Sequence, residues 1–207
     1  MKRLSSADRG QPLSKSEHEI YRAIVGSLLY LACWTRPDIS FAVSELSRFV
    51  SDPGVTHMQA AKRVLRYLNG TRDLKLTYSR PEEAKLNQLW GYVDSDWAGC
   101  VDSRKSTTGY VLMFNGAAVS WKSKRQNVVA LSSAEAEFMA ASALVQEVIY
   151  IRKLLERLGY PQSSLLLFSK IIVPALLGLK VQSEAVIELN TLIFVFILFM
   201  MPFRMEY

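Results

Sequence analysis

The sequence predicts an α/β protein in which a helical segment is followed by a mixed sheet that carries one long helix. Three features support this prediction. Apolar residues recur at helical spacing through residues 16–80, short apolar runs between turn residues follow within 86–125, and a second helical pattern runs from Ser132 to Leu158. Helices followed by strands and a further helix indicate an α+β arrangement around a mixed sheet.

Composition and charge limit the class of protein. Half of the 207 residues are hydrophobic and 21% are charged, so the chain can bury one sizeable core or two small ones and is not a disordered tail. The net charge of +6 favours a polyanion as partner without requiring one. Cys33 and Cys100 are too few for a disulfide framework, which predicts reduced thiols and no zinc site.

The first part of the chain predicts two helices after a flexible lead. Residues 1–15 are polar and lack the apolar core of a secretory signal. A helix is expected from Ser16, with one face formed by Ile20, Ile24, Leu28 and Leu31. The segment TRPD breaks it, and the pattern resumes with Phe41, Leu46 and Phe49.

A third helix is predicted from Thr56, as its N-cap, to a stop at Asn69-Gly70. Its basic face fits either a solvated surface or a contact with nucleic acid, and it is formed by Lys62, Arg63 and Arg66. His57 is expected to start the helix and not to bind a ligand.

Three strands and a long helix are predicted next. The strands are expected at Leu89–Asp94, Gly109–Phe114 and Ala117–Lys122. Asn115-Gly116 between the last two is a two-residue hairpin signal. Ser132 and Glu135 form a capping-box pattern at the start of the helix, and Gly159 marks its stop.

The two glutamates of the segment SSAEAEF differ in the helix face that they occupy. At about 100° per residue, Glu137 lies on the apolar stripe, whereas Glu135 points elsewhere and has a local role in the cap. That stripe is formed by Ala141, Leu144, Val148, Ile151, Leu155 and Leu158. An unpaired charge on such a face is costly. Glu137 is therefore expected to have a partner: either a divalent cation shared with Asp94 or a Lys or Arg side chain.

Three segments together carry a family resemblance. They read YRAIVGSLLYLACWTRPDISFAVSELSRFV, HMQAAKRVLRYLNGTRDLKL and GYVDSDWAGCVDSRKSTTGYVLMFNGAAVSWKSKRQNVVALSSAEAEF. In order and spacing they resemble the carboxy-terminal part of the Pol polyprotein of copia-type LTR retrotransposons, over roughly Tyr21 to Tyr160. On this resemblance, residues 16–80 correspond to the tether after the reverse-transcriptase thumb, and residues 86–160 to part of a ribonuclease H-like domain.

The resemblance implies a mixed sheet flanked by helices, whose carboxylates bind Mg²⁺ and hydrolyse the RNA strand of an RNA–DNA hybrid. Asp94 matches the aspartate of the first strand and Glu137 the glutamate of the first helix, so both are expected to be catalytic and to bind metal. Asp96 is expected to cap the turn instead. Basic side chains expected to follow the phosphates of the hybrid are Arg104, Lys105, Lys122, Lys124 and Arg125.

Residues 161–207 depart from the family pattern and form a divergent apolar tail. The family continues with a fourth strand that ends in Cys-Asp-Asn and with a later aspartate, whereas this chain has no aspartate after Asp102. A strand at Leu165–Phe168 would end in Ser169-Lys170, where a lysine would repel a cation. Glu184 and Glu188 are the acidic residues nearby. The domain is therefore expected to be incomplete and inactive, or severely impaired.

The apolar run Leu192–Phe203 is shorter than the roughly 20 residues of a membrane-spanning helix. It is the one segment through which contact with a membrane is expected, and its alternatives are covering the exposed sheet and aggregating.

A second class of function comes from the tetrapeptide RVLR. Arg63, Val64, Leu65 and Arg66 resemble the host-targeting motif of secreted oomycete effectors, a pattern of low specificity. That resemblance implies a non-catalytic protein, secreted into a host cell without a recognisable signal peptide, that binds host proteins and modulates host defence or cell death. The favoured expectation is an intracellular location, in cytoplasm or nucleus. An enzyme would cut a hybrid with magnesium, whereas an effector would be exported and would not.

Overall fold

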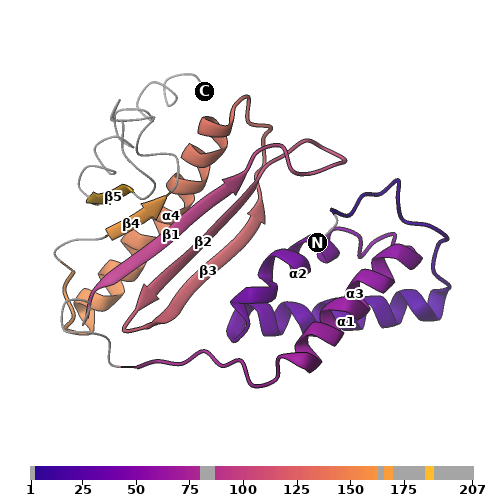
Figure 1. Ribbon diagram of the computed structural model, residues 1–207, viewed down its shortest axis with the longest axis horizontal. Coiled ribbons are helices and arrows are strands. Elements are labelled where there is room, and N and C mark those ends of the chain that lie inside the picture. Colours follow the sequence, from indigo (N-terminus) through magenta and orange to yellow (C-terminus); the bar gives the residue numbers. More distant parts are fainter. Residues whose placement is uncertain (1–2, 80–86, 163–165, 170–184, 189–207) are drawn as a thin grey trace. The chain divides into compact units, whose positions relative to one another are not determined.

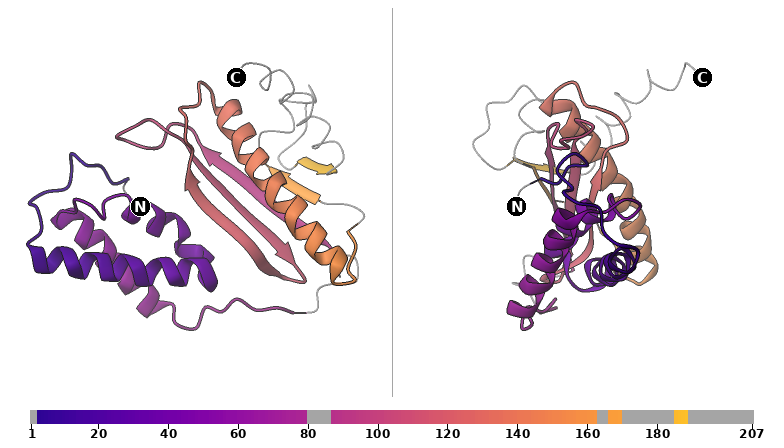
Figure 2. Two further views of the ribbon diagram at one scale, coloured as in Figure 1. Left: turned by 180° about the vertical axis from the view of Figure 1, so that it is seen from behind. Right: turned by 90° about the vertical axis from the view of Figure 1, so that its right-hand side faces the viewer.

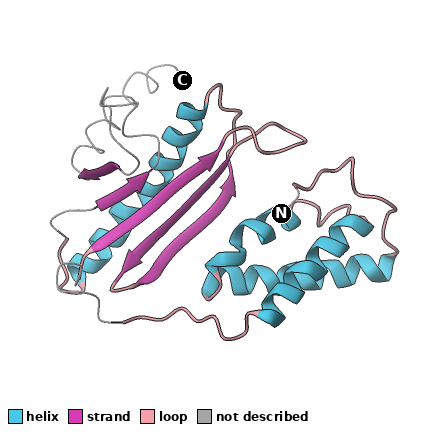
Figure 3. Ribbon diagram, viewed as in Figure 1, coloured by secondary structure: helices cyan, strands magenta, loops and turns pink. Residues whose placement is uncertain are grey.

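The computed structural model describes residues 3–79 and 87–162, together with the backbone of 166–169 and 185–188. It confirms the predicted mixed α/β class (Figure 1, Figure 3). The helices are α1 (Lys15–Trp34), the short 3-10 helix η1 (Pro37–Ile39), α2 (Ser40–Ser47), α3 (Val55–Gly70) and α4 (Ser133–Arg157). The strands are β1 (Leu89–Asp96), β2 (Thr107–Phe114), β3 (Ala117–Arg125), β4 (Leu166–Ser169) and β5 (Ala185–Glu188).

The chain forms two compact units. The helical unit comprises Met1–Leu76, Ala98–Thr107 and Lys122–Val129, and the sheet unit comprises Thr77–Trp97, Thr108–Trp121 and Ala130–Tyr207. The loop after β1 and the end of β3 therefore group with the helices, although they adjoin the strands in sequence. The predicted division into a tether at 16–80 and a domain at 86–160 stays a prediction.

Helix α1 begins with a capping box. The Ser14 hydroxyl accepts a hydrogen bond from the Glu17 backbone N–H, and the Glu17 carboxylate accepts one from the Ser14 backbone N–H at 2.9 Å. These bonds satisfy two of the donors that a helix start leaves unpaired. The hydrogen bonds from Ser14 lower the pKa of Glu17.

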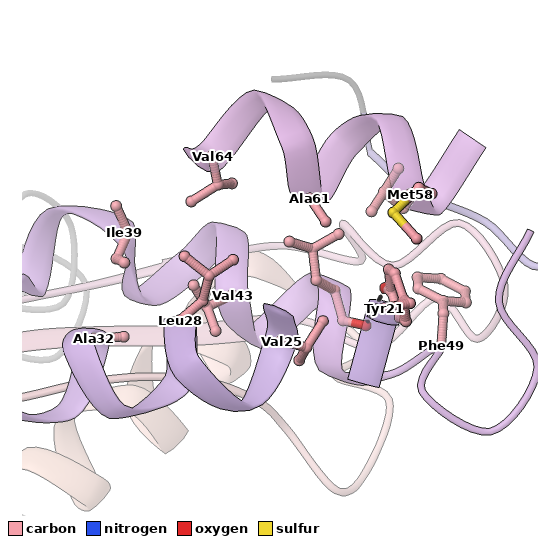
Figure 4. Packing of buried hydrophobic residues seen from close by; sticks show 12 residues of the cluster. Tyr21, Val25, Leu28, Ala32, Ile39, Val43, Phe49, Met58, Ala61 and Val64 are labelled. Carbon is pink, nitrogen blue, oxygen red and sulfur yellow. Dashed lines mark hydrogen bonds between the residues drawn. The ribbon is translucent and has the colours of Figure 1, made fainter. Parts of the chain in front are cut away.

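The buried face of α1 differs from the predicted one by one position. Tyr21, Val25, Leu28 and Ala32 are buried, whereas Ile20 is 54% exposed. The Tyr21 hydroxyl donates to the Leu46 carbonyl at 2.8 Å, so the ring enters the core with its polar group satisfied (Figure 4). Hydropathy alone ranked isoleucine above tyrosine and therefore placed the stripe wrongly.

The core of the helical unit joins α1, α2 and α3. Side chains from all three helices meet in one cluster (Figure 4), which includes Leu28, Val43, Leu46, Ala61 and Val64. Of the three residues expected to resume the pattern after TRPD, Leu46 and Phe49 are buried and Phe41 is half-buried.

The N-cap of helix α3 lies two residues before the predicted one. Gly54 is its N-cap, and Thr56 lies inside the helix. A Cβ on Gly54 would come within 2.2 Å of the Arg9 carbonyl oxygen, so a tertiary contact selects glycine here. His57 Nδ1 accepts from the Gly54 N–H at 3.2 Å, which confirms its role at the helix start. Burial lowers the pKa of His57, consistent with a neutral ring.

A pair of glycine substitutions tests this packing. Gly26 lies in the middle of α1, and a Cβ there would meet nothing within 4 Å. We expect Gly26→Ala to raise the free energy of unfolding by about 0.5–1 kcal/mol, because alanine loses less backbone entropy in a helix. Gly54→Ala should lower it because of the clash with Arg9. Urea titration of both variants measures these changes, and a destabilised Gly26→Ala variant would contradict the open space described here.

The sheet has the order β3-β2-β1-β4-β5, in which β1 to β3 are antiparallel (Figure 1). The hairpin between β2 and β3 turns at Asn115 and Gly116, whose φ angles of 47° and 82° confirm the predicted two-residue turn. Strands β1, β2 and β3 are all longer than predicted. Strand β4 runs parallel to β1 and pairs Leu166 with Trp90, and β5 runs antiparallel to β4. The fourth strand predicted at Leu165–Phe168 is thus present as β4.

Helix α4 lies along one face of this sheet (Figure 2). Its buried residues, among them Leu144 and Val148, pack against Leu89 and Val93 of β1 and Leu112 of β2. The predicted stripe is confirmed up to Leu155. Leu158 is 61% exposed because the helix ends at Arg157.

The start of α4 differs in one detail from a capping box. The Ser132 hydroxyl accepts from the Glu135 N–H at 3.1 Å as predicted. The Glu135 carboxylate, however, accepts from the backbone N–H of Leu131 and not from that of Ser132. Both bonds still satisfy backbone donors at the helix start.

No helix in the described part of the chain combines the length and hydropathy needed to cross a bilayer. The apolar run Leu192–Phe203 lies outside the described residues, and so does Glu184.

Candidate active site

Strand β1 positions Asp94. Along this strand Leu89, Gly91 and Val93 are buried, and Asp94 alternates with Val93 and is exposed. The strand continues to Asp96, two residues beyond its predicted end. Asp96 is therefore the last residue of the strand, where it is half-buried.

Helix α4 positions Glu137 one turn after its start. Glu137 is 4% exposed, whereas Glu135 is exposed. The different environments expected from the helix angle are therefore confirmed. Two small buried residues, Ala136 and Ala140, lie beside Glu137 on the helix and allow close packing there.

The environment of Glu137 disfavours its negative charge. Burial, and secondarily the charge of Asp94, raise the pKa of Glu137 to about 7. Its Oε2 atom is buried and has no hydrogen-bond partner. Among residues 3–79 and 87–162, no Lys or Arg forms an ion pair with Glu137. The salt-bridge alternative is thus not seen in the described residues, and the two acids interact as like charges.

A divalent cation fits this pair of carboxylates. Carboxylate oxygens are the ligands that Mg²⁺ prefers, and a cation near Glu137 would offset both its burial and the repulsion from Asp94. In the part of the chain that the structure describes, no cluster of three or more His, Cys, Asp or Glu residues is placed to hold a metal. Asp94 and Glu137 would therefore bind such an ion with water in the remaining positions.

Sequence reasoning missed Ser95. Its hydroxyl oxygen is buried and has no hydrogen-bond partner, and it follows Asp94 directly in β1. The alternation of β1, which places Ser95 on the same face as Val93, is the signal that could have predicted its burial.

The five basic residues expected to contact phosphates all lie in segments of the helical unit. Arg104, Lys122 and Lys124 are exposed. Lys105 donates through Nζ to the Asn127 carbonyl, and Arg125 donates to Cys100 Sγ at 3.5 Å. The first three side chains are thus available to a ligand, whereas the other two make contacts within the protein.

A polar cluster surrounds Cys100 in the helical unit. The Arg48 guanidinium donates to Cys100 Sγ at 3.0 Å, and the Ser103 hydroxyl donates at 3.0 Å. Burial by itself would raise the pKa of the Cys100 thiol, but the hydrogen bonds of Ser103 and Arg125 and the charge of Arg48 outweigh it and lower the pKa to about 7.

Thiol labelling checks this arrangement. Cys33 is exposed and Cys100 is 2% exposed. We expect the native protein to react rapidly with Ellman's reagent at Cys33 alone, because burial denies access to Cys100 even though its pKa is low. Unfolding should expose the second thiol, and a Cys33→Ser variant should react only after unfolding. Rapid labelling of that variant in its native state would contradict the burial of Cys100.

The RVLR tetrapeptide lies inside α3. Val64 is 6% exposed, and Arg63 and Arg66 are exposed. Leu65 is 39% exposed. The motif is therefore part of a regular helix packed through Val64.

The relatives of the chain include a protein described as an effector and several Pol polyproteins. It is 52% identical over 131 residues to a Plasmopara viticola protein described as secreted RxLR effector protein 161, covering 63% of this chain and 90% of that protein. It is 44% identical over 148 residues to the retrovirus-related Pol polyprotein from transposon TNT 1-94 of Nicotiana tabacum, covering 72% of this chain and 11% of the polyprotein. The corresponding polyprotein from transposon RE1 of Arabidopsis thaliana is 45% identical over 139 residues, covering 67% of this chain and 9% of the polyprotein.

The chain thus spans about a tenth of the length of the Pol polyproteins that it matches. No family model matches the chain, and no solved structure does. Identities above 40% extend over both helical and strand segments of the sequence, in agreement with the family resemblance of its motifs. Over about 70% of its own length, the chain is therefore homologous to one segment of copia-type retrotransposon Pol polyproteins.

Proposed function

We propose that the sheet unit is a ribonuclease H-like domain that binds a divalent cation through Asp94 and Glu137 but cleaves RNA–DNA hybrids weakly or not at all. The observation that carries the proposal is the buried, unpartnered Oε2 of Glu137, with the charge of Asp94 acting on the same carboxyl group. Structural carboxylates at such burial normally have a hydrogen bond or a cation, so an orphaned oxygen is typical of a ligand site.

The topology supports the same proposal. An antiparallel β1 to β3 is followed by α4, and β4 then returns parallel to β1 at its other side. This order gives a mixed sheet with a helix on one face, as the family resemblance implies, and places the last strand residues of β1 near the start of the covering helix.

The residues of this chain would have separate roles. A bound cation supplies activation of water and stabilisation of the leaving oxygen in enzymes of this class. Asp94 is exposed, so it would attract the cation first. Glu137 must release a proton to bind, and a pKa near 7 makes cation binding compete with protonation at neutral pH. In the helical unit, the exposed side chains of Arg104, Lys122 and Lys124 would attract a polyanion as point charges.

Two carboxylates are too few to bind a pair of divalent cations, and this limits the rate of RNA cleavage. The described residues offer no third acidic ligand beside Asp94 and Glu137, and the sequence has no aspartate after Asp102. Strand β4 ends at Ser169 and is followed by Lys170. A site with half of the ligands would bind metal weakly and would stabilise little of the charge that develops in the transition state.

Calorimetric titration with Mn²⁺ or Mg²⁺ tests cation binding by this pair. We expect the affinity to rise between pH 6 and pH 8, with a proton released on binding at pH 6, and to be lost in Asp94→Asn and in Glu137→Gln. Glu156→Gln on the exposed side of α4 is the matched control. An affinity that is independent of pH and unchanged in both variants would contradict the proposal.

A second candidate function is favoured by one observation. The chain covers 90% of a Plasmopara viticola protein described as a secreted RxLR effector at 52% identity. If this function is correct, the chain is secreted, binds host proteins and has no hydrolytic activity. Export of a reporter fused to the chain tests it, with Arg63→Ala and Arg66→Ala as paired variants. Because α3 is packed through Val64, we expect these exposed arginines to be replaceable without unfolding, so unchanged export in both variants would reject RVLR as the signal.

A further inference from the structure

The described residues of the helical unit form an apolar groove. The groove has a volume of about 650 Å³ and lies between the carboxy-terminal parts of α1 and α3 and the segment that follows α3. Its apolar lining consists of Leu31, Leu65, Leu68, Leu74 and Leu76. Leu65 is 39% exposed and Leu74 55% exposed, so part of this apolar surface faces solvent. We propose that this groove binds an acidic amphipathic helix of a partner protein.

The polar lining of the groove is positively charged. Arg36, Arg72 and Lys75 line it, and none of the described lining residues is acidic. Arg36 is held in place, because its guanidinium donates to both oxygens of Asp38 at 2.9 and 2.7 Å and to the Thr71 hydroxyl at 2.7 Å. Arg72 is exposed and donates to the side-chain oxygen of Asn69, and Lys75 is exposed. A ligand with carboxylates along its polar side would therefore meet Lys75 at the edge of the groove, with Arg72 beside it.

The charge of α3 extends this positive surface. The helix contains no Asp or Glu between Val55 and Gly70, and Lys62 and Arg66 are exposed one turn apart. Arg66 is one turn before Gly70 and lies on the helix that contributes Leu65 and Leu68 to the groove. The long-range potential would attract an acidic partner to the same region.

The lining favours a helix over a nucleic acid. Single-stranded nucleic acids bind basic grooves by stacking their bases on aromatic side chains. Within residues 3–79 and 87–162, no aromatic residue lines this groove. Leucines are instead the side chains that receive the apolar anchors of an amphipathic helix at positions i, i+3, i+4 and i+7. The proposal is independent of cation binding in the sheet unit.

The experiment uses the full chain and a fluorescein-labelled 16-residue peptide that has leucine at helical anchor positions and glutamate elsewhere. Its controls are a scrambled peptide of the same composition and a single-stranded RNA. By fluorescence anisotropy, the patterned peptide should bind at micromolar concentrations and the scrambled peptide at least about tenfold more weakly, a difference of about 1.4 kcal/mol. Equal binding of both peptides, or no binding up to about 1 mM, would overturn the proposal.

Variants on the exposed rim locate the site. Leu65→Glu should weaken the patterned peptide at least about tenfold, because it places a charge on the apolar lining and opposite the acidic peptide. Lys75→Glu should weaken binding of the patterned peptide about threefold or more at low salt. Arg63→Glu makes the same change of charge outside the lining and should weaken binding less than about twofold. Unchanged thermal melting of each variant shows that the fold is intact. Peptide binding that is unaffected in Leu65→Glu would reject an acidic helix as the occupant. The same conclusion would follow if the peptide failed to bind and the RNA bound instead, with its binding abolished by Leu65→Glu and by Lys75→Glu.

Discussion

Replacing Glu137 by glutamine should stabilise the protein by about 3 kcal/mol at pH 8 and have little effect near pH 4. The cause is the raised pKa, about 7 in the folded protein against 4.5 for the free side chain. The pKa of Glu137 is higher in the folded than in the unfolded state. Its contribution to the free energy of unfolding is therefore fully present below pH 4.5 and is lost as the pH rises through 7. Glutamine keeps the shape of the side chain and removes the charge that burial and Asp94 penalise.

Urea titrations at several pH values measure this effect. The free energy of unfolding of the unmodified chain should fall between pH 5 and pH 8. In Glu137→Gln this fall should be smaller by about 3 kcal/mol, the contribution of the glutamate. Glu156→Gln, also in α4 but exposed, should stay within about 0.5 kcal/mol at each pH. If Glu137→Gln proved less stable than the unmodified chain at pH 8, the carboxylate would have a favourable partner, and the orphaned oxygen would have to be reinterpreted.

The substitution Gly91→Ala should destabilise the sheet unit by about 3 kcal/mol, at the upper end of the range for overpacked cores. A Cβ on Gly91 would lie 2.7 Å from Leu112 Cδ2 and 2.9 Å from the Val111 carbonyl oxygen. Leu112 is fully buried, so its side chain has little room to move aside. The Val111 carbonyl belongs to the backbone of β2 and cannot move without disturbing the pairing of β1 with β2. Either the leucine leaves its rotamer or the strands separate.

Gly109→Ala is the matched control in the same sheet. A Cβ there would be 3.8 Å from the Asp94 carbonyl oxygen, an ordinary contact, and we expect a change within about 0.5 kcal/mol. Chemical denaturation followed by tryptophan fluorescence compares the two variants directly. Equal stability of Gly91→Ala and Gly109→Ala would mean that β1 and β2 are not as closely packed at Gly91 as the structure shows.

Local signals predicted the elements well, and tertiary contacts explain the differences. The turn at Asn115-Gly116 requires positive φ at both positions, which few residues tolerate, so the sequence identifies it directly. The start of α3 depends instead on how closely Gly54 approaches Arg9, a residue 45 positions earlier, which no local pattern reveals. The buried face of α1 depends on a hydrogen bond from Tyr21 to Leu46, which hydropathy does not include.

The candidate site was predictable to a similar extent. The burial of Glu137 follows from the helix angle alone, because its stripe is otherwise apolar. The effect of Asp94 on Glu137 depends on the packing of α4 against β1. The residue pattern offered Asp94 only as one of two alternatives, and the family resemblance favoured it. Which basic residues stay available to a ligand was not predictable, because the contacts of Lys105 and Arg125 lie with Asn127 and Cys100 in separate loop segments.

A magnesium-dependent cleavage assay on a labelled RNA–DNA hybrid tests the central claim most directly. The preparation should show a cooperative unfolding transition, and Asp94→Asn and Glu137→Gln serve as paired variants. We predict no cleavage above the level of these variants, together with cation binding that both substitutions abolish. Cleavage by the unmodified chain that both substitutions eliminate would contradict the predicted loss of activity and would mean that residues 161–207 supply the missing ligands.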